Sequence, residues 1–278
     1  MSFLVIAFSK ICALSSSALI KSATSNGKCN SPMKFNALKT GSTFAFFALI
    51  FVYGLKFHMP TFAFASCYGV FYALSTHFGY MALATGPMSL SSLIASYNII
   101  IPWFFGITFL NEKAGIVQIA GFLLLVVSMF LIMKKNDRFV ISKKWLVFIG
   151  ITFLSNGICA ITQKMHQTMY PSQFYNEFTV YSLCVLFLLF LIISVSSKEQ
   201  NLKGVTKFAV LSGVLVGISE YLILLLSATM DASVLFPVST ILAALFNVII
   251  SRIFFKEKLS PVQLVGIVTG VISILLIK

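Results

Sequence analysis

Apolar runs of about 18 or more residues recur along the whole of this 278-residue chain. Each run is long enough to cross a hydrocarbon core of about 30 Å as a helix, because an α-helix rises about 1.5 Å per residue. A water-soluble domain has no place for so much apolar sequence, since 59% of the residues are apolar and only 10% are charged. A membrane barrel would need short alternating strands instead. The sequence therefore predicts an all-α polytopic membrane protein.

Breaks between the apolar runs define ten predicted helices. Gly86-Pro87 is one such break, because these residue types together favour a turn. Nothing basic precedes the first run and Lys10 interrupts it, so we expect a membrane helix there rather than a cleaved signal peptide. The ten predicted spans are 3–20, 37–55, 61–84, 89–110, 115–133, 145–163, 173–194, 206–228, 232–253 and 260–277.

A polar elbow between two apolar runs occurs twice, at a constant offset of 145 residues. Such self-similarity indicates that the chain arose by duplication of one half. Five helices per half is an odd number, so tandem halves must lie in opposite senses across the bilayer. The sequence predicts ten transmembrane helices as two inverted five-helix repeats, residues 1–136 and 137–278. The matched residues are Glu112 and Glu257, Lys113 and Lys258, Val117 and Val262, Gln118 and Gln263, Gly121 and Gly266, and Ser128 and Ser273.

The net charge of +13 is concentrated in short loops between the predicted helices. The loops after the first, fifth, seventh and ninth helices hold fifteen Lys or Arg residues, whereas the opposite side holds four. Basic residues collect in cytoplasmic loops of membrane proteins. We therefore expect these four loops in the cytoplasm and both termini outside. The same distribution argues against a nucleic-acid partner, because it makes no continuous phosphate-binding patch.

The five-plus-five plan, the Glu-Lys elbow and the Gln-x-x-Gly that follows it resemble the EamA-type transporters of the drug/metabolite transporter superfamily. The resemblance covers nearly the whole chain. It implies ten helices around a central cavity lined by helices one, three, four, six, eight and nine, with alternating access of small metabolites. Relatives are often drawn with cytosolic termini, which is the opposite of the orientation that the charges favour. Members often carry an acidic residue and a proline midway along helices four and nine, and this chain has Asn98, Pro102, Pro237 and Asn247 there.

Ionisable residues well inside the predicted helices are candidates for function, because each costs about 2.5–3.5 kcal/mol on insertion scales. Glu220, His77 and Lys10 are the three that stand out. Lys10 and Glu220 lie at similar depth, so a pair would offset the desolvation of both charges. Ordinary packing stays open for His77, and Lys10 can also snorkel towards the headgroups. The predicted substrate or coupling-ion site comprises Glu220, His77, Lys10, Tyr72, Tyr97, Asn98, Tyr221 and Asn156.

Other chemistry-bearing residues receive structural interpretations. Glu112 and Glu257 are placed to cap helices at the membrane edge. Glu177 faces Lys164 and His166 across a short loop, where it can make a rim salt bridge or a gate contact. The five cysteines form no CxxC or Cys/His cluster, so we expect neither a disulfide framework nor a metal, and no cofactor. Two small-residue motifs predict close helix packing, with a homodimer face on the last helix as the alternative to a monomer: Gly213-x-x-x-Gly217 and Gly266-x-x-x-Gly270.

The predicted function is secondary transport of a small metabolite or drug-like solute by alternating access, with proton-coupled export as one form. Duplicated inverted halves explain such transport, because an exchange of their conformations opens the site to either side in turn. An intramembrane enzyme is the alternative, but the chain lacks HExxH, GxSxG and paired aspartates. A non-transporting receptor or scaffold fits the composition but leaves the duplication unexplained. We expect a multi-pass protein of the cell membrane whose partners are a small-molecule substrate and the lipid bilayer.

Overall fold

A computed structural model of the chain describes an all-α protein. It describes residues 2–25, 32–51, 53–109, 115–133, 142–170, 173–196, 205–227, 242–243, 246, 250, 253–254 and 260–277. Apart from one 3-10 turn, the regular structure in these ranges is α-helical, which confirms the all-α part of the predicted fold class. Most of the predicted helix 232–253 lies outside the described residues. So do both Glu-Lys elbows, including Glu112 and Glu257.

The helices follow the predicted spans, except that α1 ends five residues later, α2 begins five residues earlier and α7 ends six residues later. Helix α7 continues six residues beyond the apolar run, to Met169. Hydropathy predicts only the membrane-spanning part of a helix, and the first residue after that part that cannot continue a helix is Pro171. The helices are α1 (Ser2–Ser25), α2 (Pro32–Phe51), α3 (Met59–Thr85), α4 (Met88–Ser96), α5 (Ile100–Phe109), α6 (Ile116–Met133), α7 (Lys143–Met169), α8 (Tyr175–Ser196), α9 (Thr206–Ser227) and α11 (Pro261–Ile277).

The predicted helix 89–110 is broken in the middle. A 3-10 turn, η1 (Tyr97–Ile99), separates α4 from α5. Pro102 explains the break: it has no N–H to donate to the carbonyl of Asn98, and its ring crowds that carbonyl. A 3-10 turn inside a helix often marks a hinge. This turn carries two of the predicted site residues, Tyr97 and Asn98.

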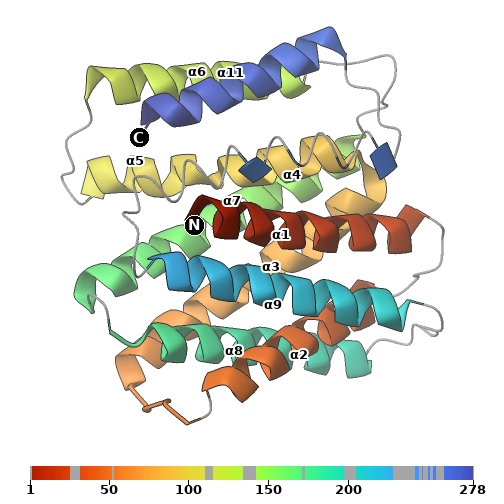
Figure 1. Ribbon diagram of the computed structural model, residues 1–278, viewed down its shortest axis with the longest axis vertical. Helices are drawn as coiled ribbons and strands as arrows, with labels where there is room; N and C mark the ends of the chain where they lie inside the picture. The colour runs from red at the N-terminus through yellow and green to blue at the C-terminus, as the bar shows by residue number, and fades with distance from the viewer. Residues whose placement is uncertain are drawn as a thin grey trace.

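The helices are arranged as stacked pairs that share one general direction (Figure 1). The α6·α11 pair lies at one end of the longest axis and the α2·α8 pair at the other, with α1, α3, α7 and α9 between them. Six helix pairs make most of the contacts between elements. These are α6·α11, α3·α7, α1·α9, α3·α8, α2·α8 and α2·α9.

In the part of the chain that the structure describes, three helices are long and apolar enough to cross a membrane, judged by length and composition. Their apolar spans are Leu4–Thr24, Lys143–Gln163 and Tyr175–Val195. Among the side chains that the structure describes, nineteen polar ones are buried and sixteen of these are Ser or Thr, while large apolar side chains lie outside. Ile192 and Val195 of α8, for example, are 65% and 79% exposed. Small hydroxyl residues inside and large apolar residues outside is the pattern of helices packed in lipid. These features indicate a membrane protein.

Many of the interior hydroxyls are satisfied within their own helix. Thr40 donates to the carbonyl of Asn36 at 2.8 Å, Thr152 to that of Phe148 at 2.8 Å, and Thr162 to that of Ile158 at 2.9 Å. This back-bonding to the carbonyl four residues earlier hides the hydroxyl without any partner helix. It lets polar side chains enter an apolar interior at low cost.

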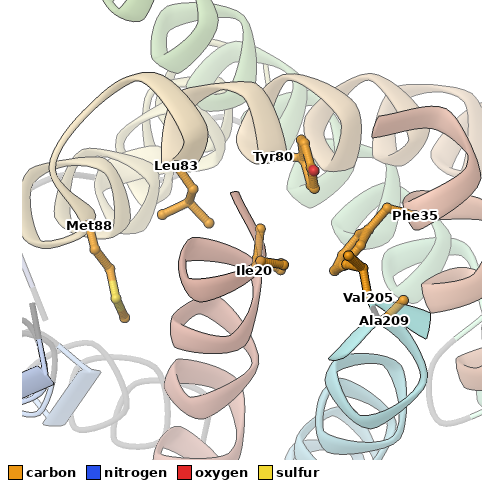
Figure 2. Packing of buried hydrophobic residues seen from close by; sticks show 8 residues of the cluster. Ile20, Phe35, Tyr80, Leu83, Met88, Val205 and Ala209 are labelled. Carbon is orange, nitrogen blue, oxygen red and sulfur yellow. The ribbon is translucent and has the colours of Figure 1, made fainter. Parts of the chain in front are cut away.

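An apolar cluster joins five elements at the end of the bundle where α1 finishes and α9 begins. Its side chains converge from α1, α2, α3, α4 and the start of α9, and the rings of Phe35 and Tyr80 lie 5.1 Å apart (Figure 2). Lys21 of α1 lies beside this cluster. Its Nζ donates to the carbonyl oxygens of Leu83 and Gly86, where α3 ends.

Both small-residue motifs are used inside the chain. A Cβ at Gly213 would collide with the backbone carbonyl of Lys39 in α2, and one at Gly270 would collide with Tyr97 and Ser128. Ser128 in α6 also donates to the carbonyl of Gly266 in α11 at 2.6 Å. The glycines therefore allow close approach within the bundle, as the packing interpretation predicts.

We predict that Gly213→Ala destabilises the protein, because the new methyl group meets a backbone atom that cannot rotate away. Overpacking of this kind costs about 1–3 kcal/mol. The measurement is the melting temperature of the purified protein in detergent. Gly150→Ala is the matched control, since a Cβ at Gly150 of α7 meets nothing within 4 Å. Equal melting temperatures for the two variants would contradict the close α2·α9 contact.

Candidate functional site

Two serine pairs fix how α1 packs against α9. The Ser9 hydroxyl lies 3.1 Å from the Ser219 hydroxyl, and the Ser16 hydroxyl lies 2.7 Å from that of Ser212. All four serines are buried. Residue numbers rise along α1 while they fall along α9, so the two helices are antiparallel. The register is therefore set by hydroxyl pairs two helical turns apart.

This register brings two predicted site residues to the same level of the helix pair. Lys10 directly follows Ser9 in α1, and Glu220 directly follows Ser219 in α9. Lys10 is half-buried. The side chains of Glu220 and Tyr221 lie outside the described residues, although both positions belong to α9. The similar depth expected from the sequence is thus accompanied by adjacency of the two backbones.

A second antiparallel pair, α3·α7, carries a comparable polar contact. The Ser75 hydroxyl donates to Asn156 Oδ1 at 2.5 Å, and a Cβ at Gly79 would lie 3.6 Å from the Thr152 methyl group. Asn156 is half-buried, whereas Ser75 is buried. The 145-residue offset takes Ser75 to position 220 and Asn156 to position 11, next to Lys10. The two helix pairs therefore place polar residues at corresponding levels.

Tyr72 and His77 lie on α3 near this contact. Tyr72 is half-buried, with its ring 5.5 Å from that of Tyr68. His77 is also half-buried, and its ring meets Phe78 edge-on at 5.2 Å. Nδ1 of His77 is buried and has no hydrogen-bond partner within the part of the chain that the structure describes. A buried ring nitrogen without a partner is costly, so it suits a site completed by a ligand or water.

Tyr97 occupies a different environment from the other predicted site residues. It is fully buried, and its hydroxyl lies 2.9 Å from the Ser128 hydroxyl of α6. Ser128 in turn donates to Gly266 of α11, so Tyr97 is tied to the α6·α11 pair. Its neighbour Asn98 is half-buried. The structure thus brings the Lys10 and Glu220 positions together on α1·α9, and it joins Asn156 of α7 to α3. Tyr72 of α3 packs against the apolar cluster of α2 and α8, while Tyr97 belongs to a third contact.

The serines that build these contacts were not among the predicted site residues. Ser9 and Ser16 on α1, and Ser212 and Ser219 on α9, are both spaced seven residues apart. Seven residues are close to two helical turns, so such spacing puts both serines of a helix on one face. That matched spacing is the signal from which the α1·α9 pairing can be found in the sequence.

Within the described residues, no three His, Cys, Asp or Glu side chains lie close enough together to hold a metal ion. The geometry instead offers hydroxyls, an amide, a lysine and an unpartnered imidazole nitrogen. Such groups can bind a polar solute or exchange a proton with one.

Comparison with known proteins places the fold only. No family model matches the sequence, and no curated protein matches it either. A solved structure described as "Crystal structure of protein" is similar over 99% of this chain and 96% of its own length, with a TM-score of 0.65 and 16% identity. At that identity the likeness shows a shared fold and nothing about activity.

We predict that Ser9→Cys combined with Ser219→Cys forms a disulfide under mild oxidation, in a background without the five native cysteines. The two hydroxyl oxygens are 3.1 Å apart, so sulfur atoms at the same positions face each other across the helix pair. Mass spectrometry of the linked peptides is the measurement. Ser9→Cys combined with Ser212→Cys is the control and should stay unlinked, because the partners are two turns out of register. The reverse result would overturn the α1·α9 register.

Proposed function

We propose that this chain is a secondary transporter of the EamA type, built from ten membrane helices in two inverted repeats. In this proposal it moves a small metabolite or drug-like solute across the cell membrane by alternating access. The observation that carries the proposal is the pattern of helix contacts under the 145-residue offset. The fold likeness at 16% identity is compatible with it and adds no function.

The contact pattern repeats itself when one half of the chain is exchanged for the other. The offset takes α1 to α7, α2 to α8, α3 to α9 and α6 to α11. It therefore turns α3·α7 into α1·α9 and α3·α8 into α2·α9, while α6·α11 and α2·α8 turn into themselves. Pairs that map onto themselves are expected on a two-fold axis, and pairs that exchange are expected on either side of it.

Antiparallel register supports the inverted sense of the halves. Ser75 pairs with Asn156, and Ser9 with Ser219, so both exchanging pairs are antiparallel. Buried small residues at equivalent positions on α6 and α11, Ser128 and Ser273, also fit a self-paired contact on the axis. In transporters of this design, substrate and coupling ions bind near the bilayer midplane between the repeats. The corresponding place in this chain is the level of the helix pairs at which Lys10, Glu220, Ser75 and Asn156 lie.

In this arrangement, two charged residues inside the membrane can serve transport. A lysine and a glutamate at one level of α1·α9 offset each other's desolvation, and a proton or a charged solute can compete for the carboxylate. Exchange of that partner is the coupling step we propose. An intramembrane enzyme would need a nucleophile with a base beside it, and the contacts described above supply hydroxyl pairs without one.

The first test is a ligand-stabilisation screen of purified protein against amino acids, nucleosides, cations and drugs. A solute that binds the folded state raises the melting temperature. At a solute concentration one hundred times its Kd, the free energy of unfolding increases by about 2.7 kcal/mol. A solute found in this way is then followed into proteoliposomes. Binding without movement across the bilayer would favour a receptor and contradict the transporter.

We predict that Glu220→Gln abolishes or uncouples that transport while leaving membrane insertion intact. The amide keeps the shape of the side chain but carries no charge and accepts no proton. Solute flux into proteoliposomes with and without a pH gradient is the measurement. Exchange of the two residues, Lys10→Glu with Glu220→Lys, should restore part of the flux if they pair. Normal flux with unchanged pH dependence in Glu220→Gln would leave this carboxylate with a structural role.

The orientation of the repeats has its own test. Reporter fusions after residue 138 and at the C-terminus should give opposite answers, with the first in the cytoplasm. The reason is the excess of Lys and Arg in the loops that we assign to the cytoplasm. A cytoplasmic answer from the C-terminal fusion would establish the orientation in which relatives of the EamA type are drawn.

A further inference from the structure

Two of the three histidines of the chain are joined through one hydroxyl, at an end of the bundle away from the proposed transport site. His58 Nδ1 lies 2.8 Å from Thr61 Oγ1, and the same oxygen lies 3.0 Å from His166 Nε2. His58 precedes α3, Thr61 is in its first turn, and His166 is in the last turn of α7. The chain of bonds therefore ties the start of α3 to the end of α7.

Aromatic rings enclose both imidazoles. Phe174 stacks flat on His58 at 4.2 Å, and Tyr170 meets the same ring edge-on at 5.0 Å. Phe178 of α8 lies 4.8 Å from the His166 ring, and Phe64 of α3 lies 5.9 Å from it. His166 is consequently only 1% exposed. The rings extend the connection to the segment between α7 and α8.

The backbone of Phe174 is strained. Its φ of 55° lies in the left-handed region that bulky residues rarely adopt. Such strain costs on the order of 1–3 kcal/mol and persists only where surrounding contacts hold it. The contacts around Phe174 are the stack on His58, the Tyr170 ring at 6.1 Å and the bond from the Phe178 N–H to the Phe174 carbonyl at 2.9 Å.

One hydroxyl between two ring nitrogens tolerates one extra proton and resists a second. With both rings neutral, Thr61 donates to one nitrogen and accepts an N–H from the other. If one ring becomes a cation, the hydroxyl can turn and still donate to the remaining bare nitrogen. If both rings are cations, the oxygen can accept both N–H groups, but its own proton loses its acceptor nitrogen and two like charges face each other across it. The bonded arrangement is then disfavoured.

The groups around His166 do little to support its charged form. From α3 and the segment before it come Thr61, Phe64 and His58, and from α8 comes Phe178. Glu177 of α8 accepts from the backbone N–H of Lys56 at 3.1 Å, and the side chain of Lys164, its predicted rim partner, lies outside the described residues. Tyr170, which follows the last residue of α7, places its ring 5.4 Å from that of His166, and Tyr181 of α8 donates to the Lys56 carbonyl at 3.0 Å.

Burial lowers the pKa of His166, and the positive charge that His58 can carry lowers it further. His166 lies beyond the apolar span of α7, which ends at Gln163. A histidine whose pKa is lowered in the closed state binds fewer protons there than when it is exposed. Closure is therefore fully stable above the ordinary pKa of about 6.5 and loses stability as the pH falls below it.

The opposite end of the bundle has a clamp of different chemistry. The 145-residue offset pairs His166 with Lys21, whose Nζ donates to carbonyls at the other end of α3. Lys21 directly follows Ile20, whose side chain belongs to the apolar cluster with Phe35 and Val205 (Figure 2). A lysine in ordinary surroundings keeps its charge through neutral and mildly acidic pH, whereas a histidine does not. Both ends of α3 are thus held by equivalent positions of the two halves through different chemistry.

We propose that His58, Thr61 and His166 form a proton-binding latch that closes the α3–α7–α8 end of the bundle at neutral pH and releases it at acidic pH. The charge distribution puts this end on the side opposite the basic loops, so the latch senses protons outside the cytoplasm. The proposal goes beyond transport, because a latch of this kind is a property of the structure whether or not a solute moves.

The test measures a distance across the latch at two pH values. Spin labels are placed at Met59→Cys and Asn176→Cys, both exposed positions, in a background without native cysteines. Pulsed electron resonance in lipid nanodiscs then gives the populations of short and long distances at pH 8 and pH 5. The ratio of open to closed should rise by up to about tenfold for each pH unit below about 6.5, until the lowered pKa is reached.

Three variants decide whether the histidines are responsible. His166→Gln should stay closed at both pH values, because the amide can bond Thr61 but does not titrate. Thr61→Val should open at both, since it removes the shared hydroxyl. His77→Gln replaces the third histidine, and its ratio of open to closed populations should change with pH as in the wild type.

A wild-type distance that is the same at both pH values would overturn the proposal, as would an unchanged pH response in His166→Gln. If the labelled chain does not fold, hydrogen exchange of residues 173–178 in the unlabelled protein gives the same comparison. Those amides should lose protection at pH 5, after correction for the intrinsic pH dependence of exchange, in the wild type and not in His166→Gln. Equal protection at both pH values in the wild type would also overturn the latch.

Discussion

Close contact between antiparallel helices is the constraint on which the rest of this structure depends. In an apolar interior the helices gain no hydrophobic energy from each other, so they associate through packing and through bonds between small polar side chains. Gly213 against the Lys39 carbonyl, and Ser9 against Ser219, show both devices at work. Because these contacts allow little tolerance, they fix the register of each helix pair. The level of every polar group along the bundle follows from that register.

The fold class and most helix bounds follow from hydropathy, because the length of an apolar run reflects the thickness that it must cross. The errors occur where hydropathy is silent. Helix α7 continues through the polar residues 164–169 because no helix-breaking residue intervenes, and α2 starts at Pro32, ahead of the apolar run, because proline suits a first helical position. The break at Tyr97–Ile99 follows from Pro102, which is visible in the sequence. To place the break, one must also know which backbone carbonyl loses its hydrogen bond.

The candidate site was predictable in its residue types and less so in its partners. Cost of burial identifies Lys10, His77 and Glu220 as unusual. It does not say that Asn156 meets Ser75, or that Tyr97 is bonded to Ser128 in a separate contact, since both depend on helix rotation. A hydrophobic pattern fixes rotation poorly when all faces of a helix are apolar. The histidine latch escaped prediction for the same reason, because His58 and His166 are 108 positions apart and meet only through packing.

The two kinds of interior hydroxyl imply an order of assembly during synthesis. Thr40, Thr152 and Thr162 bond to carbonyls of their own helices, so each can enter the bilayer as soon as its helix forms. Ser9 and Ser16 have partners on a helix that is made about two hundred residues later. At the usual elongation speed of about 5–20 residues per second, α1 stays in the membrane for roughly 10–40 seconds before α9 arrives. During that interval its serines must be shielded by lipid headgroups, water or the insertion machinery, which makes α1 the segment most exposed to quality control.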